Sequence, residues 1–393
     1  MLKIKWNPLY IFYILMLLHT LYFAQGVLYT GGSIISKTFL ILITGISFFY
    51  FIKSLSIKKA KGSFFNLWTT LLVLNILSFI LTGKYTDFNH FNMFQFIFTG
   101  MLPFYPAFYL SSKNHITEKH IVLFLFFLIP VDILKFFYTE LTLLADLTRD
   151  KTTVNYAYSF AMLVPYIFFI KNKKIAYAVI VIIIFFLMQG AKRGALFAGL
   201  AGISIYVYYQ LRYGVNRYKI LNYLQVAIAL VFIFFAADYF FSKNDYFMGR
   251  MQNIAEAKSL SIRFENYIAI WDAWSNTNSI QNLLLGYGFA GSIKLTGGLF
   301  AHNDWLEILS NLGLIGIIVY LSTLISGFNL YRKLQNPTIK YALFAILITW
   351  LLMSMGSMYY TSVFLFKHAI LLGFIAGYYF KLTKSKNNIN LLS

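Results

Sequence analysis

The chain consists of apolar runs of about 20 residues separated by short polar gaps. A hydrocarbon core about 30 Å thick requires about 20 apolar residues per helix, so each run predicts a membrane-spanning helix. The run from Ile175 to Met188 lacks the alternation of polar and apolar positions that membrane β-barrels require. We predict about twelve spans, at residues 8–28, 34–52, 64–82, 91–110, 120–138, 153–170, 174–190, 194–210, 219–241, 304–327, 339–359 and 361–380.

This pattern predicts an all-α fold, a polytopic transmembrane helical bundle. No repeat of fixed period and no low-complexity tract divides residues 1–393, so we expect a single integral membrane domain. Lys3 and Lys5 precede the first apolar run as in a signal peptide, but no small-residue cleavage site follows. We therefore interpret the first run as an uncleaved span.

Composition supports a membrane protein and excludes several functions. The chain is 59% hydrophobic and 12% charged, whereas soluble domains contain about 25% charged residues. The net charge of +20 does not indicate nucleic-acid binding, because the basic residues fall in the gaps between apolar runs rather than on one soluble face. The absence of cysteine and the scattering of the six histidines leave no spacing typical of a metal site, so we expect neither a metal nor a cofactor.

The positive-inside rule orients the chain. Most of the 33 Lys and Arg residues lie at the N-terminus, in alternate loops and in the C-terminal tail, with Glu118 as the only acidic residue there. Both termini are therefore predicted to be cytoplasmic. The same topology places residues 242–303 outside as one large loop, which carries charged residues between aromatic side chains that favour the headgroup level.

Lys192 and Arg193 depart from this charge rule, because they occupy a short turn on the predicted outer face. Two cations at the start of a helix also oppose the helix dipole. A bound anion would account for both observations. The alternative is that the two side chains extend to lipid headgroups.

Arg263 and Glu265 lie two residues apart in the predicted outer loop. The planar guanidinium of arginine is suited to phosphate, which it binds through two parallel hydrogen bonds. From this segment alone, a structural salt bridge between Arg263 and Glu265 or Asp272 is the favoured alternative.

The most distinctive segment joins Gly286-Tyr287-Gly288 to His302-Asn303-Asp304 and Glu307. The glycines do not form a dinucleotide-binding motif, because the required strand and helix context is absent. Asn303 and Asp304 are suited to capping the next span, and His302 could act as a base or as a charged donor near neutral pH. Acidic residues inside a span are functional candidates, which adds Asp304 and Glu307.

Other charged residues lie within the predicted spans. Asp132 and Lys135 are three residues apart and could pair on one helix face. Asp238 ends one span, and Lys367 with His368 lies in the last, where Lys367 could contribute to a lipid-phosphate pocket. We consider a structural role more plausible for each.

Residues 185–327 resemble the O-antigen ligase and polymerase superfamily of integral membrane enzymes. The resemblance rests on three segments: Lys192-Arg193-Gly194-Ala195-Leu196, Arg263-Phe264-Glu265 with Trp271 downstream, and Leu285-Gly286-Tyr287-Gly288 followed by His302-Asn303-Asp304-Trp305-Leu306-Glu307 and Leu312-Gly313-Leu314-Ile315-Gly316. The N-terminal half is similar only in its hydrophobicity.

The resemblance implies a membrane glycosyltransferase of the GT-C-like type that acts without a metal on an undecaprenyl-diphosphate-linked glycan donor. Carried over by position, Arg193 and Arg263 would bind the diphosphate, and His302 would assist the acceptor hydroxyl or bind the donor. Lys192, Glu265, Asn303, Asp304 and Glu307 would line the substrate site. No carboxylate is marked as the general base.

Three functions fit this pattern. We favour polymerisation of lipid-linked repeat units of O-antigen, capsule or exopolysaccharide on the outer face of a bacterial inner membrane. A ligase that transfers the finished glycan to a lipid A-core or other acceptor is the first alternative, and a transporter or flippase is the second, although no related halves are visible in the sequence. Expected partners are the donor, the glycan acceptor, membrane lipid, a chain-length regulator and a separate flippase, with no nucleic acid.

Overall fold

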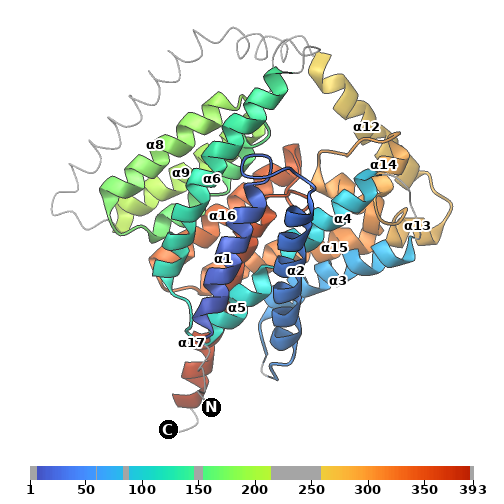
Figure 1. Cartoon of the computed structure of the whole chain (residues 1–393). Coiled ribbons are helices and arrows are strands. Elements are labelled where there is room, and N and C mark those ends of the chain that lie inside the picture. Colours follow the sequence, from blue (N-terminus) through green and yellow to red (C-terminus); the bar gives the residue numbers. More distant parts are fainter. Residues whose placement is uncertain (1–6, 59, 83–87, 146–153, 214–257, 390–393) are drawn as a thin grey trace.

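Helices account for all regular structure in the described part of the chain, apart from an isolated bridge between Gln25 and Tyr29. The computed structural model describes residues 7–58, 60–82, 88–145, 154–213 and 258–389 (Figure 1). The predicted span at 219–241, Asp238 and the start of the 242–303 loop lie outside these ranges. The described elements of the N-terminal half are α1 (Leu9–Phe23), α2 (Ile34–Leu55), α3 (Ser63–Leu81), α4 (Phe88–Met101), α5 (Phe104–Ser112), α6 (Glu118–Leu144), α7 (Ala157–Ala161), the 3-10 helix η1 (Val164–Phe169), α8 (Lys173–Gln189) and α9 (Arg193–Tyr213).

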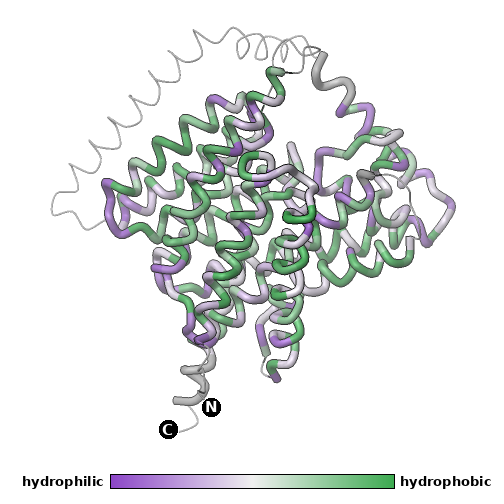
Figure 2. The backbone as a smooth tube through the Cα atoms, in the orientation of Figure 1, coloured by the Kyte–Doolittle hydropathy of each residue, from purple (hydrophilic) through white to green (hydrophobic). Residues whose placement is uncertain are grey.

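The C-terminal half contains one helix of 18 residues, two short helices and then three long ones. They are α12 (Lys258–Ser275), α13 (Ile280–Leu285), α14 (Gly291–Leu295), α15 (Asp304–Lys333), α16 (Pro337–Gly356) and α17 (Leu365–Ile389). The hydropathy along the backbone shows apolar helix bodies with polar residues gathered at their ends (Figure 2).

Seven helices in the described ranges are long and apolar enough to cross a membrane, namely α2, α3, α6, α9, α15, α16 and α17. The chain is therefore a helical, multi-pass membrane protein. Four further predicted spans correspond to shorter or broken elements: α1, α4 with α5, α7 with η1, and α8. Pro103, which has no backbone N–H, stands at the break between α4 and α5, and Pro165 lies in η1.

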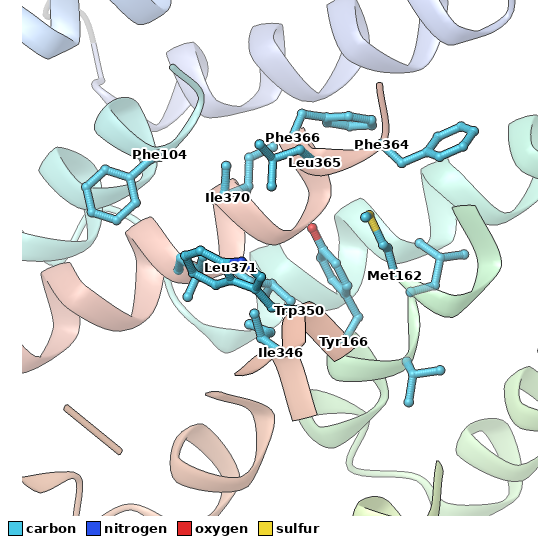
Figure 3. Close-up of a cluster of buried hydrophobic side chains, with 14 of the residues drawn as sticks. Phe104, Met162, Tyr166, Ile346, Trp350, Phe364, Leu365, Phe366, Ile370 and Leu371 are labelled. Carbon is cyan, nitrogen blue, oxygen red and sulfur yellow. The ribbon is translucent and has the colours of Figure 1, made fainter. Parts of the chain in front are cut away.

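Close backbone contacts hold the bundle together where small residues meet a neighbouring helix. Gly373 and Gly377 of α17 face α5 so closely that an added Cβ would lie 2.1 Å from the Phe104 carbonyl oxygen and 2.4 Å from that of Phe108. Small residues four apart permit this approach between membrane helices. Side chains from α5, η1, α16 and α17 then fill the adjoining core, with Tyr166, Trp350 and Leu371 among them (Figure 3).

The two ends of the bundle can be traced through contacts between helix termini. Asn303, at the start of α15, donates to the Met355 carbonyl near the end of α16 at 3.1 Å. Tyr209, near the end of α9, shares a hydrogen bond of 2.8 Å with Thr338 at the start of α16. The starts of α9 and α15 and the end of α16 therefore lie at one end, which we call the His302 end. The starts of α6, α8 and α16 lie at the opposite end.

Candidate functional site

Asn303 is the N-cap of α15, as its sequence position predicts. Its side-chain oxygen accepts from the backbone N–H groups of Trp305 at 2.9 Å and Leu306 at 3.2 Å. Its amide also donates to Met355, so one side chain both begins α15 and joins it to α16. This fixes the backbone immediately after His302.

The carboxylate of Asp304 is fully buried and points into the protein. It accepts from the Tyr320 hydroxyl at 2.7 Å and from the backbone N–H groups of Tyr359 at 2.9 Å and Tyr360 at 3.1 Å. Tyr320 in turn accepts from the indole N–H of Trp350 at 2.6 Å. Asp304 therefore joins α15 to the segment between α16 and α17, and its oxygens face these donors.

Glu307 is also buried and secures a different segment. Its carboxylate accepts from the Ser292 hydroxyl and, at 3.0 Å, from the backbone N–H of Ala301. These contacts attach α14 and the chain that leads to His302 to the first turn of α15. Asp304 and Glu307 are the residues predicted to bind substrate. In the structure their hydrogen bonds hold the segments on either side of His302 in place.

The glycine-containing segment packs into a break in α15. Gly313 is non-helical (φ 60°, ψ −155°), and an added Cβ there would lie 2.5 Å from the Gly286 nitrogen. The Tyr287 N–H donates to the Ser310 carbonyl at 2.7 Å. The break at Gly313 leaves this carbonyl without a partner in its own helix, so the contact with Tyr287 satisfies it. Asn311 accepts from the Gly291 N–H at 2.7 Å. The glycines of this motif therefore allow two backbones to meet.

His302 itself lies at a positive φ of 53° with an exposed side chain. Its carbonyl accepts from the Tyr267 hydroxyl at 3.4 Å. Desolvation by the surrounding protein, together with the positive charges of Arg263 and Lys192, lowers the pKa of His302 to about 4. The imidazole is therefore neutral at pH 7 in the unliganded protein.

Arg263 is exposed on α12 and donates to the Gly356 carbonyl at 3.4 Å. Positions 263, 267, 270 and 274 share one face of this helix, and Ile270 on that face is fully buried. Glu265 and Asp272 are exposed on the other side, and neither forms an ion pair with Arg263. The structural salt bridge considered from the sequence is therefore absent, and the guanidinium lies near His302 instead.

Lys192 and Arg193 begin α9 at the same end of the bundle. Arg193 is the first residue of the helix, and Ala191 immediately before the pair has a positive φ of 48°. The structure brings Lys192 close enough to His302 to lower its pKa, and Arg193 is adjacent in the chain. Three elements distant in sequence, α9, α12 and the start of α15, thus contribute one cationic region around a neutral imidazole.

Tyr267 belongs to this region but was missed by the sequence analysis. It lies one helical turn after Arg263 and contacts the His302 backbone, and burial raises the pKa of its hydroxyl. Its position four residues after Arg263, on the same helix face, is the sequence feature that could have identified it. Within the described ranges, no group of three or more His, Asp or Glu residues could hold a metal ion.

The charged residues inside the bundle pair differently from the sequence expectation. Asp132 forms a buried ion pair with Lys367, whose ammonium also donates to the Ser159 hydroxyl. Lys135 donates to the Gln25 carbonyl and does not pair with Asp132. Lys367 is enclosed by protein, so the lipid-phosphate pocket considered for it is wrong.

No family model matches this chain, and the comparison with curated proteins found no match.

Proposed function

We propose that this protein is a metal-independent membrane glycosyltransferase that polymerises undecaprenyl-diphosphate-linked oligosaccharide repeat units on the outer face of a bacterial inner membrane. The observation that carries the proposal is that Arg263 on α12 and Lys192 at the start of α9 lie at the same end of the bundle as His302. Two cations converging on a neutral base from separate helices suit a reaction in which a diphosphate departs and a hydroxyl attacks.

In the proposed reaction, an acceptor hydroxyl attacks the anomeric carbon of the donor sugar, and the bond between that carbon and the diphosphate oxygen breaks. Arg263, Lys192 and Arg193 offset the negative charge of the diphosphate as it leaves. His302 accepts the proton of the attacking hydroxyl. Burial lowers the pKa of His302 most, and the two cations lower it further. A bound diphosphate would offset the cations and make the imidazole a stronger base.

A lipid-linked donor also needs a place for its hydrocarbon chain. An apolar groove of about 520 Å³ lies between α2 and α4, lined by Leu40, Ile41, Phe48, Phe91, Phe94 and Phe98 among others. Phe94 contacts Phe289 of the segment that supports His302, with ring centroids 6.0 Å apart. We assign the prenyl chain to this groove, whose lining on α4 runs from Phe91 to Thr99.

The proposal includes a bundle of about twelve spans of the GT-C-like type, with both termini in the cytoplasm and membership of the O-antigen ligase and polymerase superfamily. It rests on the motif segments in residues 185–327 and on their meeting at one end of the bundle. Polymerisation is preferred to ligation because ligation requires a lipopolysaccharide core, whereas polymerisation also covers capsule and exopolysaccharide systems.

The test is the length distribution of glycan products in a strain that lacks the native protein. We expect wild type to restore a ladder of repeats, and Arg193→Ala, Arg263→Ala or His302→Ala to leave single lipid-linked units at matched membrane expression. Arg212→Ala, an equal charge change at the far end of α9, is the control and should retain the ladder. Long lipid-linked chains that fail to reach an acceptor in the mutants would identify a ligase. Full activity in all three mutants would reject the site.

A further inference from the structure

A polar pocket lies at the end of the bundle opposite His302. It has a volume of about 400 Å³ and is formed where the starts of α6 and α16 meet the ends of α5 and α17. Its lining includes Lys119, Lys171 and Lys381, with Glu118 as its one carboxylate. The lining therefore has a net charge of +2, from three lysines and one glutamate.

The cations of this pocket are available to a ligand. Lys119 and Lys171 are exposed, and among the described residues neither forms an ion pair. Lys381 donates to the side-chain oxygen of Asn114 at 2.8 Å, which holds its ammonium at the pocket. The three side chains come from α6, the η1–α8 connection and α17, so the tertiary fold gathers them.

An apolar furrow continues directly from this pocket. A second hollow of about 270 Å³ shares Glu118, Lys119 and Lys171 with the first and extends between α6, η1 and α8. Val122 and Phe126 line it and share a helix face with Lys119, because they follow it by three and seven residues. Phe169 and Ile175 form its other side.

We infer that this pocket and furrow bind an anionic glycerophospholipid, with the phosphate at Lys119, Lys171 and Lys381 and an acyl chain along Val122, Phe126 and Ile175. A cationic mouth joined to an apolar channel on a membrane helix matches both parts of such a molecule. A free phosphate would use only the polar half. The inference depends on the protein spanning a membrane and is independent of glycosyl transfer.

Lipid retention by the purified full-length protein tests this site. After equilibration with equal amounts of phosphatidylglycerol and phosphatidylcholine, lipids that stay bound are counted by native mass spectrometry. We expect about a tenfold preference for phosphatidylglycerol, which Lys119→Ala/Lys171→Ala/Lys381→Ala abolishes. The matched control Lys53→Ala/Lys61→Ala/Lys340→Ala removes three lysines from the same end but outside the pocket and furrow, and should keep the preference.

Two further arms separate a lipid from a free phosphate. Val122→Trp fills the furrow while leaving the three lysines in place, and should reduce phosphatidylglycerol retention. Excess inorganic phosphate in wild type should leave that retention unchanged. The assignment would be overturned if wild type retained both lipids equally, or if the pocket and control variants lost phosphatidylglycerol equally. It would also be overturned if Val122→Trp retained phosphatidylglycerol fully, or if inorganic phosphate displaced that lipid from wild type.

Discussion

The Tyr320 hydroxyl donates a hydrogen bond of 2.7 Å to the Asp304 carboxylate, which joins the two parts of α15 on either side of the break at Gly313. The same carboxylate accepts two backbone N–H groups from the segment between α16 and α17. In a buried setting, such a carboxylate stabilises the fold because each donor would otherwise lack a partner.

Removing this carboxylate should therefore reduce stability. We expect Asp304→Ala to lower the free energy of unfolding by roughly 3 kcal/mol, because it leaves several buried donors unpaired. Tyr320→Phe, which keeps the two backbone contacts, should have a smaller effect. The midpoint of thermal unfolding in detergent measures both, and equal midpoints for Asp304→Ala and wild type would contradict the assignment.

Arg263 and Glu265, which both lie on α12, should differ in their importance. Arg263 lies beside His302, whereas Glu265 is exposed on another face of the helix. Arg263→Gln should reduce glycan polymerisation by about 100-fold or more, in the range found for a single donor to developing negative charge. Glu265→Gln should leave polymerisation within about twofold of wild type by the same reasoning. A comparable loss in both variants would place Glu265 in the site after all.

The protonation of His302 should depend on its burial and on its cationic neighbours. With a pKa near 4, the imidazole is neutral above about pH 5 and becomes protonated only as the pH falls through 4. Diethylpyrocarbonate reacts with the neutral form, so modification of His302, read by peptide mass spectrometry, should reach half its maximal rate near pH 4. In Arg263→Gln this midpoint should move upward, because one of the two cations is removed while the burial of the ring remains. An unchanged midpoint would show that Arg263 does not act on His302.

The break in α15 should depend on glycine at position 313. Its φ of 60° and ψ of −155° are strained for other residues, and a Cβ would meet the Gly286 backbone. We expect Gly313→Ala to destabilise the protein by about 2 kcal/mol or more. Gly356→Ala is the control, because a Cβ there has open space. Thermal unfolding should separate the two variants, and similar midpoints would argue against this role for Gly313.

The buried pair of Asp132 and Lys367 should show non-additive mutations. Lys367→Met alone leaves an unpaired carboxylate inside the bundle and should cost about 3–5 kcal/mol of stability. Adding Asp132→Leu removes that charge and should restore much of the loss, because apolar replacements of a buried ion pair are often tolerated. A double variant that unfolds as readily as Lys367→Met would contradict the view that the unpaired Asp132 carboxylate causes the loss of stability.

The sequence by itself determined that this is a helical membrane protein and where most of its helices lie. The length of an apolar run and the thickness of a bilayer are sufficient for that conclusion, since both act on each segment separately. The sequence also identified Asn303 as the cap of α15, because capping depends on neighbours two or three residues away.

Only the tertiary structure decided what the polar residues do. Asp132 is three residues from Lys135 but pairs with Lys367, and Asp304 finds its partners in Tyr320, Tyr359 and Tyr360. Lys192, Arg263 and His302 are far apart in the sequence. They come together only because α9, α12 and α15 meet at one end of the bundle. A buried polar group must find a partner wherever packing supplies one, and packing between helices is not encoded in local hydropathy.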